Sequence, residues 1–345
     1  MISLPLLCVM GPTAAGKTAL AIELAESLGG ELISVDSALV YRGLNIGAAK
    51  PDYPHHLIDI RDPAEPYSAA DFVKDAAQAI EAVRARGQVP ILVGGTLLYF
   101  RALLQGLDRI PGTPPEVRAA IEQEAAAKGW PALHAELGRV DPVLAGRLHP
   151  NHSQRIGRGL EVWRMTGRPL SSWQAGKGAP AVSGDVIPLV VMPADRAVLH
   201  ERIAHRFDAM LSEGFLDEVA TLYRRGDLST DLPAVRAVGY RQLWGYLDGE
   251  MDLEQAKHAA VAATRQLAKR QLTGLRRWPD SVWLNTGLGS EIVDVQTPLG
   301  NRWGELAAAI AGTFTEHERM ISRTKATISR QISEILRNFL AKQDH

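Results

Sequence analysis

The sequence predicts an α/β protein in which helices flank a parallel sheet on both faces and an all-helical segment interrupts the fold. Segments with strand and helix character alternate over the first third of the chain. Such alternation is typical of parallel sheets, because parallel neighbours need a crossover connection. From Pro111 to about Ser183 every regular pattern is helical, and a strand pattern returns at Val186. These observations predict one sheet-based core with a helical insertion.

The expected strands are short apolar runs bounded by turn residues. They are LPLLCVM (4–10), ELISV (31–35), HHLIDI (55–60), VPILV (89–93), VIPLVVM (186–192) and VWLN (282–285). The single cysteine, Cys8, lies in the first run. One cysteine excludes an internal disulfide and suits a reducing cytoplasm, and its apolar surroundings favour a buried, inert thiol.

Helices are expected where apolar residues recur with helical spacing. Outside the insertion these segments are Lys17 to Leu28, Ser68 to Arg86, Arg196 to Leu211, Val235 to Leu247, Leu253 to Arg277 and a last one near Arg302 to Ala311. Ser68 and Asp71 resemble a capping box, with Asp in place of Glu, which places the start of the second helix.

These elements predict three parts of the chain. A P-loop-like catalytic core is expected at residues 1–112 and 184–312, a helical insertion at 113–183 and a tail at 313–345. An apolar stripe from Glu316 to Leu340 could make the tail an amphipathic helix. Packing or self-association is favoured over a functional role, and a disordered tail or a cloning artefact stays open.

Composition indicates an ordinary soluble globular protein. The 345 residues are 46% hydrophobic and carry a formal net charge of −1. No apolar run reaches the roughly 18 residues of a membrane span, so no membrane partner is expected, and we expect a cytoplasmic monomer. The charge is uneven, because the segment from Gln255 to Trp278 contains six basic residues and no acidic one. Such a segment can mark a nucleic-acid-binding surface on a neutral protein.

The stretch GPTAAGKT, directly after the first strand and before a helix, predicts a phosphate-binding loop of the P-loop NTPase type. Its residues are Gly11, Pro12, Thr13, Ala14, Ala15, Gly16, Lys17 and Thr18. The glycines allow a tight turn whose N–H groups face an anion at the N-terminus of the helix. Lys17 would reach the terminal phosphates, and the Thr18 hydroxyl would help to hold Mg²⁺.

The fate of the bound phosphate depends on the neighbouring strand ends. A kinase or NTP hydrolase normally has an acidic residue there, but VPILV is followed by Gly94, Gly95 and Thr96. Asp36 is the carboxylate at a strand end near the loop, where ligands bind in open α/β sheets. Helix capping remains an alternative role for Asp36 and for Thr96.

Three basic clusters lie on different predicted helices. Arg265, Lys269 and Arg276 share a helix face by their spacing, Arg155 and Arg158 lie one turn apart in the insertion, and Arg236 and Arg241 flank AVGY. A solvated charged surface is the alternative for any one of them. Together they suggest a concave surface that binds a nucleic-acid backbone.

With these motifs in hand, the chain resembles the bacterial tRNA dimethylallyltransferases, also called isopentenyl transferases. The matching stretches, in the order of the family, are GPTAAGKT, DSALVYRGLNIGAAKP, HHLID, YSAADF, LVGGTLLYF, DPVLAGRLHPN, RAVGYRQ and ATRQLAKRQ. They extend from about Leu4 to Gly312. The chain departs from the pattern at Ala48, where Thr is usual, at Gly159, where Ala is usual, and at Gly274, where Trp is common.

The resemblance implies transfer of a dimethylallyl group from dimethylallyl diphosphate to the exocyclic amine of the adenosine 3′-adjacent to the tRNA anticodon. Asp36 would act as general base, Thr96 would bind the amine or the diphosphate, and Arg236 would be a second clamp on the diphosphate. Residues implied to contact the anticodon stem-loop are Asp36, Ser37, Ala38, Leu39, Thr96, Arg118, Gln154, Arg155, Ile156, Gly157, Arg158, Arg236, Ala237, Val238, Gly239, Tyr240, Arg241, Lys269, Arg270, Gln271 and Arg276.

Two other functions share some of these features. A metabolite or nucleotide kinase would have the same glycine loop but would need an acid after VPILV and arginines in a lid. A non-catalytic RNA-binding switch would change conformation with nucleotide and transfer no prenyl group.

Overall fold

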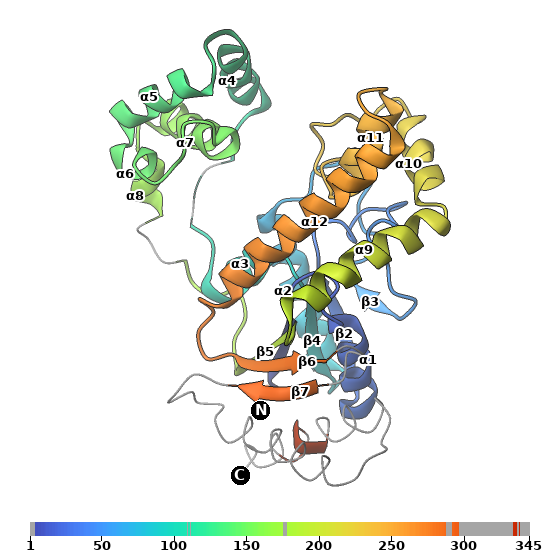
Figure 1. The fold of residues 1–345 in the computed structure, drawn as a ribbon. Coiled ribbons are helices and arrows are strands. Elements are labelled where there is room, and N and C mark those ends of the chain that lie inside the picture. The colour runs from blue at the N-terminus through green and yellow to red at the C-terminus, as the bar shows by residue number, and fades with distance from the viewer. Residues whose placement is uncertain are drawn as a thin grey trace. The chain divides into compact units, whose positions relative to one another are not determined.

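The computed structural model describes residues 4–108, 110, 112–174, 178–287, 292–296, 334–336 and 338. The chain divides into two compact units (Figure 1). The larger unit comprises Met1–Phe100 and Val182–His345, and the smaller one comprises Arg101–Ala181. Each unit has a hydrophobic core of its own.

The larger unit is built on a seven-stranded sheet in the order β3-β2-β4-β1-β5-β6-β7. Its strands are β1 (Leu6–Met10), β2 (Gly30–Val35), β3 (His55–His56), β4 (Val89–Gly94), β5 (Val186–Pro193), β6 (Val282–Thr286) and β7 (Ile292–Gln296). All neighbouring pairs are parallel except β6 and β7, which are antiparallel. The predicted parallel sheet is confirmed, and β7 is an edge strand that the sequence did not reveal.

The expected third strand was too long. Only His55–His56 pairs with β2, whereas residues 55–60 were predicted. Leu57 and Asp59 have φ angles of 66° and 57°, in the left-handed region that interrupts a strand. The HHLIDI run therefore continues as an irregular loop.

One face of the sheet packs against α1 (Lys17–Leu28), as predicted. Leu20, Ala21 and Leu24 of this helix belong to one buried cluster with Leu7, Val9 and other strand residues that alternate along the sheet. A separate set of buried side chains places α2 (Ala69–Ala85) against β2 and β4. The predicted capping box at the start of α2 is present, since Ser68 and Asp71 hydrogen-bond each other's backbone N–H groups.

The rest of the larger unit is mainly helical. It contains α3 (Leu97–Gln105, whose end belongs to the smaller unit), α9 (Arg196–Ser212), α10 (Phe215–Tyr223), α11 (Tyr240–Leu247) and α12 (Leu253–Leu275). The long helices α9 and α12 lie side by side (Figure 1), joined by packing among Leu199, Ile203, Ala268 and Leu272.

One predicted helix start needs correction, and two helices were not predicted, α3 and α10. The helix expected from Val235 begins at Tyr240, because Gly239, with φ of 93°, is its N-cap and donates its N–H to Gln242. The helix α10, which has nine residues and buries Phe215 and Val219, was not predicted from the sequence.

The smaller unit contains helices and no strand among its described residues, which confirms the all-helical prediction. Its helices are α4 (Pro115–Lys128), α5 (Trp130–Val140), α6 (Pro142–Ala145), α7 (Ser153–Thr166) and α8 (Leu170–Trp173). Buried Asp141 holds two of them, accepting hydrogen bonds from the backbone N–H groups of Leu144 and Ser171 at 3.0 and 2.8 Å.

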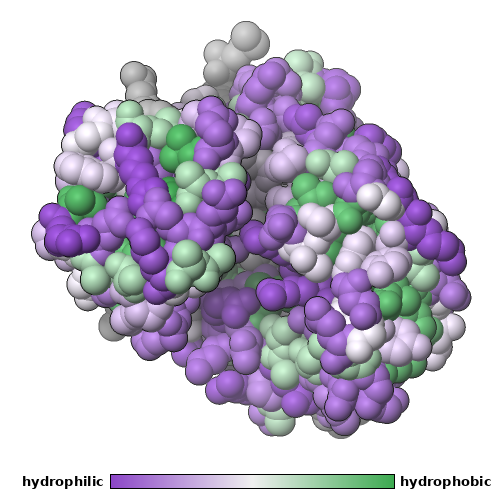
Figure 2. Space-filling view, turned by 90° about the horizontal axis from the view of Figure 1, so that it is seen from above, coloured by the Kyte–Doolittle hydropathy of each residue, from purple (hydrophilic) through white to green (hydrophobic). Residues whose placement is uncertain are grey.

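The helix expected near residues 302–311 and most of the tail lie outside the described residues. Within the tail, Leu336 is fully buried in the sheet cluster that also contains α1. No described helix is long and apolar enough to cross a membrane. Figure 2 shows mainly hydrophilic residues on the visible face, with hydrophobic residues in scattered patches.

Candidate functional site

The register of the sheet brings three strand ends to one edge. Gly94 at the end of β4 is paired with Met10 of β1 on one side and with Val35 of β2 on the other. The glycine loop, the turn at Gly95 and Asp36 therefore leave the sheet beside one another. Space is tight, because a Cβ on Gly94 would lie 2.1 Å from the Val35 carbonyl oxygen. Only glycine fits at this position.

The glycine loop has the backbone that an anion-binding turn needs. Ala14 and Gly16 have φ angles of 61° and 91°, and Gly16 is the N-cap of α1. A Cβ on Gly11 would lie 2.3 Å from the Val191 carbonyl oxygen. The Lys17 ammonium donates to the Pro12 carbonyl at 2.7 Å, and Thr18 is exposed on the first turn of α1. The helix N-terminus and the lysine thus lie together, as phosphate binding requires.

Burial and a neighbouring arginine disfavour the positive charge of Lys17. Its pKa is lowered to about 8, chiefly by burial and also by the Arg206 guanidinium, while the Asp36 carboxylate acts in the opposite direction. Burial also lowers the pKa of Arg206, and Asp36 again opposes this effect. Two partly desolvated cations near one carboxylate favour binding of a further anion.

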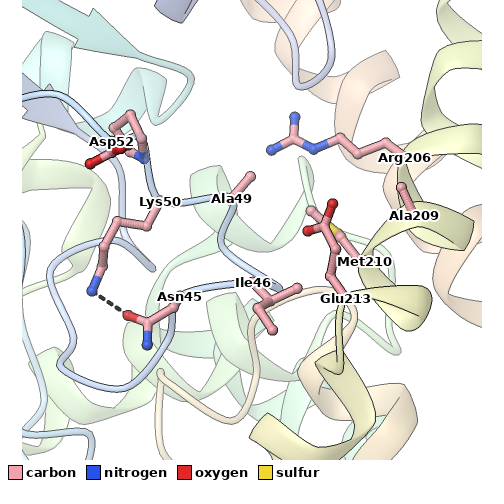
Figure 3. Close-up of a pocket in the computed structure, with 10 residues that line it drawn as sticks. Asn45, Ile46, Ala49, Lys50, Asp52, Arg206, Ala209, Met210 and Glu213 are labelled. Carbon is pink, nitrogen blue, oxygen red and sulfur yellow. Dashed lines mark hydrogen bonds between the residues drawn. The ribbon is translucent and has the colours of Figure 1, made fainter.

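Arg206 is a site residue that was not predicted from the sequence. It lies in the middle of α9 without any motif, and only the packing of α9 beside the loop reveals it. A pocket of about 470 Å³ joins Ala14 and Gly16 of the loop to Arg206. A second pocket of about 510 Å³ lies between Arg206 and the segment from Asn45 to Asp52 (Figure 3). In Figure 3 Arg206 extends from α9 toward the loop that carries Ala49.

Asp36 uses one oxygen locally and leaves the other open. Its Oδ1 accepts hydrogen bonds from the backbone N–H groups of Ala38 and Leu39 at 2.8 and 3.3 Å. Among the described residues, no donor hydrogen-bonds Oδ2. No helix begins after Asp36, so these bonds hold a local turn and the helix-capping alternative is wrong for this residue. The half-buried carboxylate keeps its second oxygen for chemistry.

Thr96 follows Gly95 in the turn between β4 and α3. Its N–H donates to the Val35 carbonyl at 3.3 Å, and its carbonyl accepts from Tyr99 and Phe100 at the start of α3. Its hydroxyl makes no hydrogen bond to any described residue. The backbone of Thr96 therefore caps the helix, and its side chain remains available.

A clamp on Glu218 holds the segment that lines the second pocket. Glu218 of α10 accepts backbone hydrogen bonds from Asn45, Ile46 and Gly47 at 2.9, 2.8 and 3.2 Å. The Tyr240 hydroxyl donates to the same carboxylate at 2.6 Å. Glu218 was not predicted from the sequence, since it lies 171 to 173 residues from its backbone partners and no pattern links the two segments. Tyr240, predicted to contact RNA, is buried and belongs to this clamp.

The predicted RNA-contacting residues of α11 and α12 differ in exposure. Arg241, Lys269, Arg270 and Arg276 are exposed, and Ala237, Val238 and Gly239 form the half-buried to buried turn before α11. Arg236 is exposed and donates to the Thr230 carbonyl at 3.3 Å, with Asp231 at 3.5 Å. The arginine that the structure brings to Lys17 is Arg206, so the diphosphate clamp expected of Arg236 stays a prediction.

The smaller unit gathers two predicted RNA contacts around one acid. Glu161 of α7 is 6% exposed and accepts from Thr113 at 2.8 Å, Arg118 at 3.1 Å and Arg158 at 3.3 Å. Burial acts to raise the pKa of Glu161, but these hydrogen bonds together outweigh it and keep the pKa below its usual value. Gln154 and Arg155 are exposed.

Not every residue of this predicted stretch can present a side chain. Ile156 is fully buried in the core of the smaller unit. Gly157 is buried against Trp130, and a Cβ on this glycine would lie 3.5 Å from the indole ring. Neither residue offers a group to an RNA backbone through its side chain.

Metal binding by protein groups alone is not supported within the described part of the chain, where no group of three or more His, Cys, Asp or Glu side chains could hold an ion. An exposed Thr18 hydroxyl beside a phosphate site fits Mg²⁺ held mainly by phosphate oxygens and water.

Comparisons with known proteins agree with this geometry. The family model described as IPP transferase matches residues 39–278. The tRNA dimethylallyltransferase of Thiobacillus denitrificans is 58% identical over 287 residues, which cover 81% of this chain and 91% of that protein. The enzyme of the same name from Thioalkalivibrio sulfidiphilus is 59% identical, covering 80% and 88% of the two chains.

Solved structures show the same fold. The tRNA isopentenylpyrophosphate transferase of Bacillus halodurans superposes with a TM-score of 0.60 at 35% identity, covering 92% of this chain and 98% of that one. A eukaryotic dimethylallyltransferase acting on tRNA has a TM-score of 0.67 at 25% identity, covering 91% and 80%. The phosphate loop and the carboxylate at a strand end agree with these matches, and the chain belongs to the IPP transferase family.

Proposed function

We propose that this protein transfers the dimethylallyl group of dimethylallyl diphosphate to the exocyclic amine of the adenosine 3′-adjacent to the anticodon in tRNA. The observation that carries this proposal is the placement of Asp36 at the end of β2. It lies close enough to Lys17 and Arg206 to act on the pKa of both. The neighbouring β4 is followed by Gly95 and Thr96, which lack the acid of a kinase.

In the reaction the amine nitrogen forms a bond to C1 of the dimethylallyl group. The bond between C1 and the bridging oxygen breaks, and its electron pair leaves with the diphosphate. Negative charge grows on that oxygen, so Lys17, Arg206 and the N-terminus of α1 stabilise the transition state more than the bound substrate. The loop therefore holds an expelled diphosphate and transfers no phosphoryl group.

Asp36 accepts the proton that the amine loses. Its Oδ1 stays fixed by Ala38 and Leu39, which orients the carboxylate, and Oδ2 is the oxygen open to the substrate. A positioned general base contributes typically about 10²–10⁴ in rate. The unengaged Thr96 hydroxyl would hydrogen-bond the amine or a diphosphate oxygen.

Mg²⁺ would be held by Thr18 and the diphosphate, and when bound it would neutralise charge on the leaving group. The dependence on Mg²⁺ is expected to appear in the affinity for the diphosphate donor. The work of the protein itself would be to place Lys17 and Arg206 around that donor.

The adenine must leave its stack to reach Asp36, at a cost of a few kcal/mol that RNA contacts must offset. Exposed Lys269 and Arg270 on α12, and Arg276 directly after it, would contact the RNA backbone from the larger unit. Arg118 and Arg158 would supply them from the smaller unit, which we propose grips the anticodon stem-loop. A cytoplasmic, monomeric enzyme would suit this substrate.

The test incubates the purified protein and unmodified tRNA with dimethylallyl diphosphate or with ATP and weighs the digested nucleosides. We expect one adenosine to gain a dimethylallyl group with the first donor and no change with the second. An unmodified transcript with brisk ATP consumption would favour the kinase alternative instead.

A further inference from the structure

Gln271 makes the hydrogen bonds of a structural bridge inside the phosphate site. Its Oε1 accepts from the backbone N–H of Thr13 at 3.0 Å, and its Nε2 donates to the Gly95 carbonyl at 3.0 Å. Thr13 lies in the glycine loop after β1, and Gly95 lies in the turn after β4. One side chain of α12 therefore joins the loop after β1 to the turn after β4.

The backbone at Gly95 passes so close to this amide that it leaves no room for a side chain. A Cβ on Gly95 would lie 2.4 Å from Nε2 of Gln271 and 3.2 Å from the Gly11 carbonyl oxygen. A side chain at this position would therefore clash with the amide where it now lies. The half-buried position of Gln271 contrasts with its exposed neighbours Lys269 and Arg270, so the helix turns this one polar residue inward.

The bridge restricts what the phosphate loop can do. The Thr13 N–H donates to Gln271 and is therefore already used, so the remaining N–H groups of the loop bind the anion. The same bond holds the loop against the turn that carries the Thr96 hydroxyl. Without the amide, the loop and the turn would have separate freedom, and ordering them on binding would cost conformational entropy. Preorganised donors avoid that cost.

We propose that Gln271 is a positioning residue for the diphosphate, which fixes the glycine loop and the Gly95–Thr96 turn in one arrangement. This role rests on the proposed function, since it concerns the same donor site. It differs from direct RNA contact, which the family resemblance implied for Gln271, because both functional ends of the amide already have backbone partners.

The experiment compares Gln271→Met, which keeps the length of the side chain and removes both hydrogen bonds, with Gln271→Glu, which keeps only the acceptor. Gln266→Met, an exposed change on the same helix, is the matched control. Steady-state kinetics give KM for dimethylallyl diphosphate and kcat, filter binding gives the Kd for tRNA, and calorimetry gives the affinity for inorganic diphosphate with Mg²⁺.

For Gln271→Met we expect KM for the donor to rise about tenfold and diphosphate affinity to fall by a similar factor, with the tRNA Kd within about twofold of wild type. Gln271→Glu should be at least as impaired, because its carboxylate faces the Gly95 carbonyl and the anion. Gln266→Met should match wild type.

Two outcomes would overturn the inference. Unchanged diphosphate affinity in both Gln271 variants would remove the positioning role, and a weakened tRNA Kd with normal KM would assign Gln271 to RNA contact. If one variant does not fold, the other still decides. Diphosphate binding needs no turnover, so a wild-type protein without prenyl transfer would refute the proposed function and leave this measurement meaningful.

Discussion

Lys17 and Arg206 in the larger unit lie near each other with Asp36 as their shared counter-charge, whereas Arg118 and Arg158 in the smaller unit both hydrogen-bond Glu161. The first pair has lowered pKa values because burial disfavours its charge, and repulsion from Arg206 adds to this effect at Lys17. The second pair is already neutralised in part by a buried carboxylate. Both sets of cations can bind anionic ligands. The first pair is desolvated and shares one counter-charge, whereas the second pair is hydrogen-bonded to a buried carboxylate.

The difference follows from what each region would bind. A small, densely charged diphosphate can enter a pocket and supply the missing counter-charge itself, so an unsatisfied pair of cations gives strong, charge-dependent binding. An RNA backbone is extended and largely solvated, and its recognition depends on where each guanidinium points. Glu161 gives the arginines a fixed direction at the cost of some of their charge.

The largest effect is expected at Asp36, which belongs to the first region but does not bind the donor. Asp36→Asn keeps an Oδ1 acceptor for Ala38 and Leu39 and removes the base, so kcat should fall by about 10²–10⁴. The tRNA Kd should stay within a few-fold of wild type. Single-turnover assays with labelled dimethylallyl diphosphate measure the chemical step.

Asp36→Ala is the companion variant, because it also removes the local hydrogen bonds. Its extra loss over Asp36→Asn gives the contribution of these hydrogen bonds. Normal turnover in either variant would exclude Asp36 as the base.

The next effect concerns pH and sharpens the comparison. Lys17, with a pKa of about 8 in the free site, is charged below pH 8 and neutral above it. Since the diphosphate binds the charged form, KM for the donor should rise above about pH 8, by at most about tenfold per pH unit. Arg206→Met removes one cause of the lowered pKa, so it should raise KM overall and move this inflection to higher pH.

Arg196→Met, an exposed change on the same helix, serves as the control for Arg206 and should leave the pH profile unchanged. A KM that is flat from about pH 7 to about pH 9 in the wild type would contradict the role given to Lys17. An inflection that moves down in Arg206→Met would have the wrong sign.

A smaller effect is expected in the smaller unit. Glu161→Gln removes the negative charge that directs Arg118 and Arg158, so tRNA affinity should fall several-fold, in keeping with the difference of about 1 kcal/mol between charge-assisted and neutral hydrogen bonds. KM for the donor should not change. Glu122→Gln, an exposed change on α4, is the control.

If Glu161 served only to lower the net positive charge, Glu161→Gln would bind tRNA more tightly than wild type. That result would reverse the contrast between the two regions. Circular dichroism would confirm that the variant keeps its helices.

The smallest change is expected on the exposed face of α12. Lys269→Met or Arg276→Met should weaken tRNA binding modestly and reduce the slope of log K against log salt by about one each. Titrations at several salt concentrations measure the slope. A slope equal to that of wild type would exclude phosphate contact at that residue.

Local patterns in the sequence predicted the parts of the fold that depend on local chemistry. The glycine loop, the strand ending at Asp36 and the Ser68 capping box each follow from a few adjacent residues. Arg206 and Glu218 were not predicted, because their roles come from the packing of α9 and α10 against loops that lie far earlier in the chain. The early end of β3 was not predicted, because the residue pattern does not reveal residues with left-handed backbone angles such as Leu57.

The partners of Gln271 were equally hidden, since Thr13 and Gly95 are distant in sequence and offer only backbone groups. No pattern of residue types marks such a contact. The sequence could therefore predict which loop binds phosphate, but not what holds that loop in place.

The most direct test of the central claim, that the diphosphate at the glycine loop is expelled whole and no phosphoryl group is transferred, follows the bridging oxygen of the donor. Dimethylallyl diphosphate with a heavy oxygen isotope at that position is incubated with the protein and tRNA, and the products are analysed by mass spectrometry. We predict that all of the label leaves in the diphosphate, because the bond between carbon and oxygen breaks. Label retained in dimethylallyl alcohol, with the diphosphoryl group transferred to another acceptor, would contradict this claim.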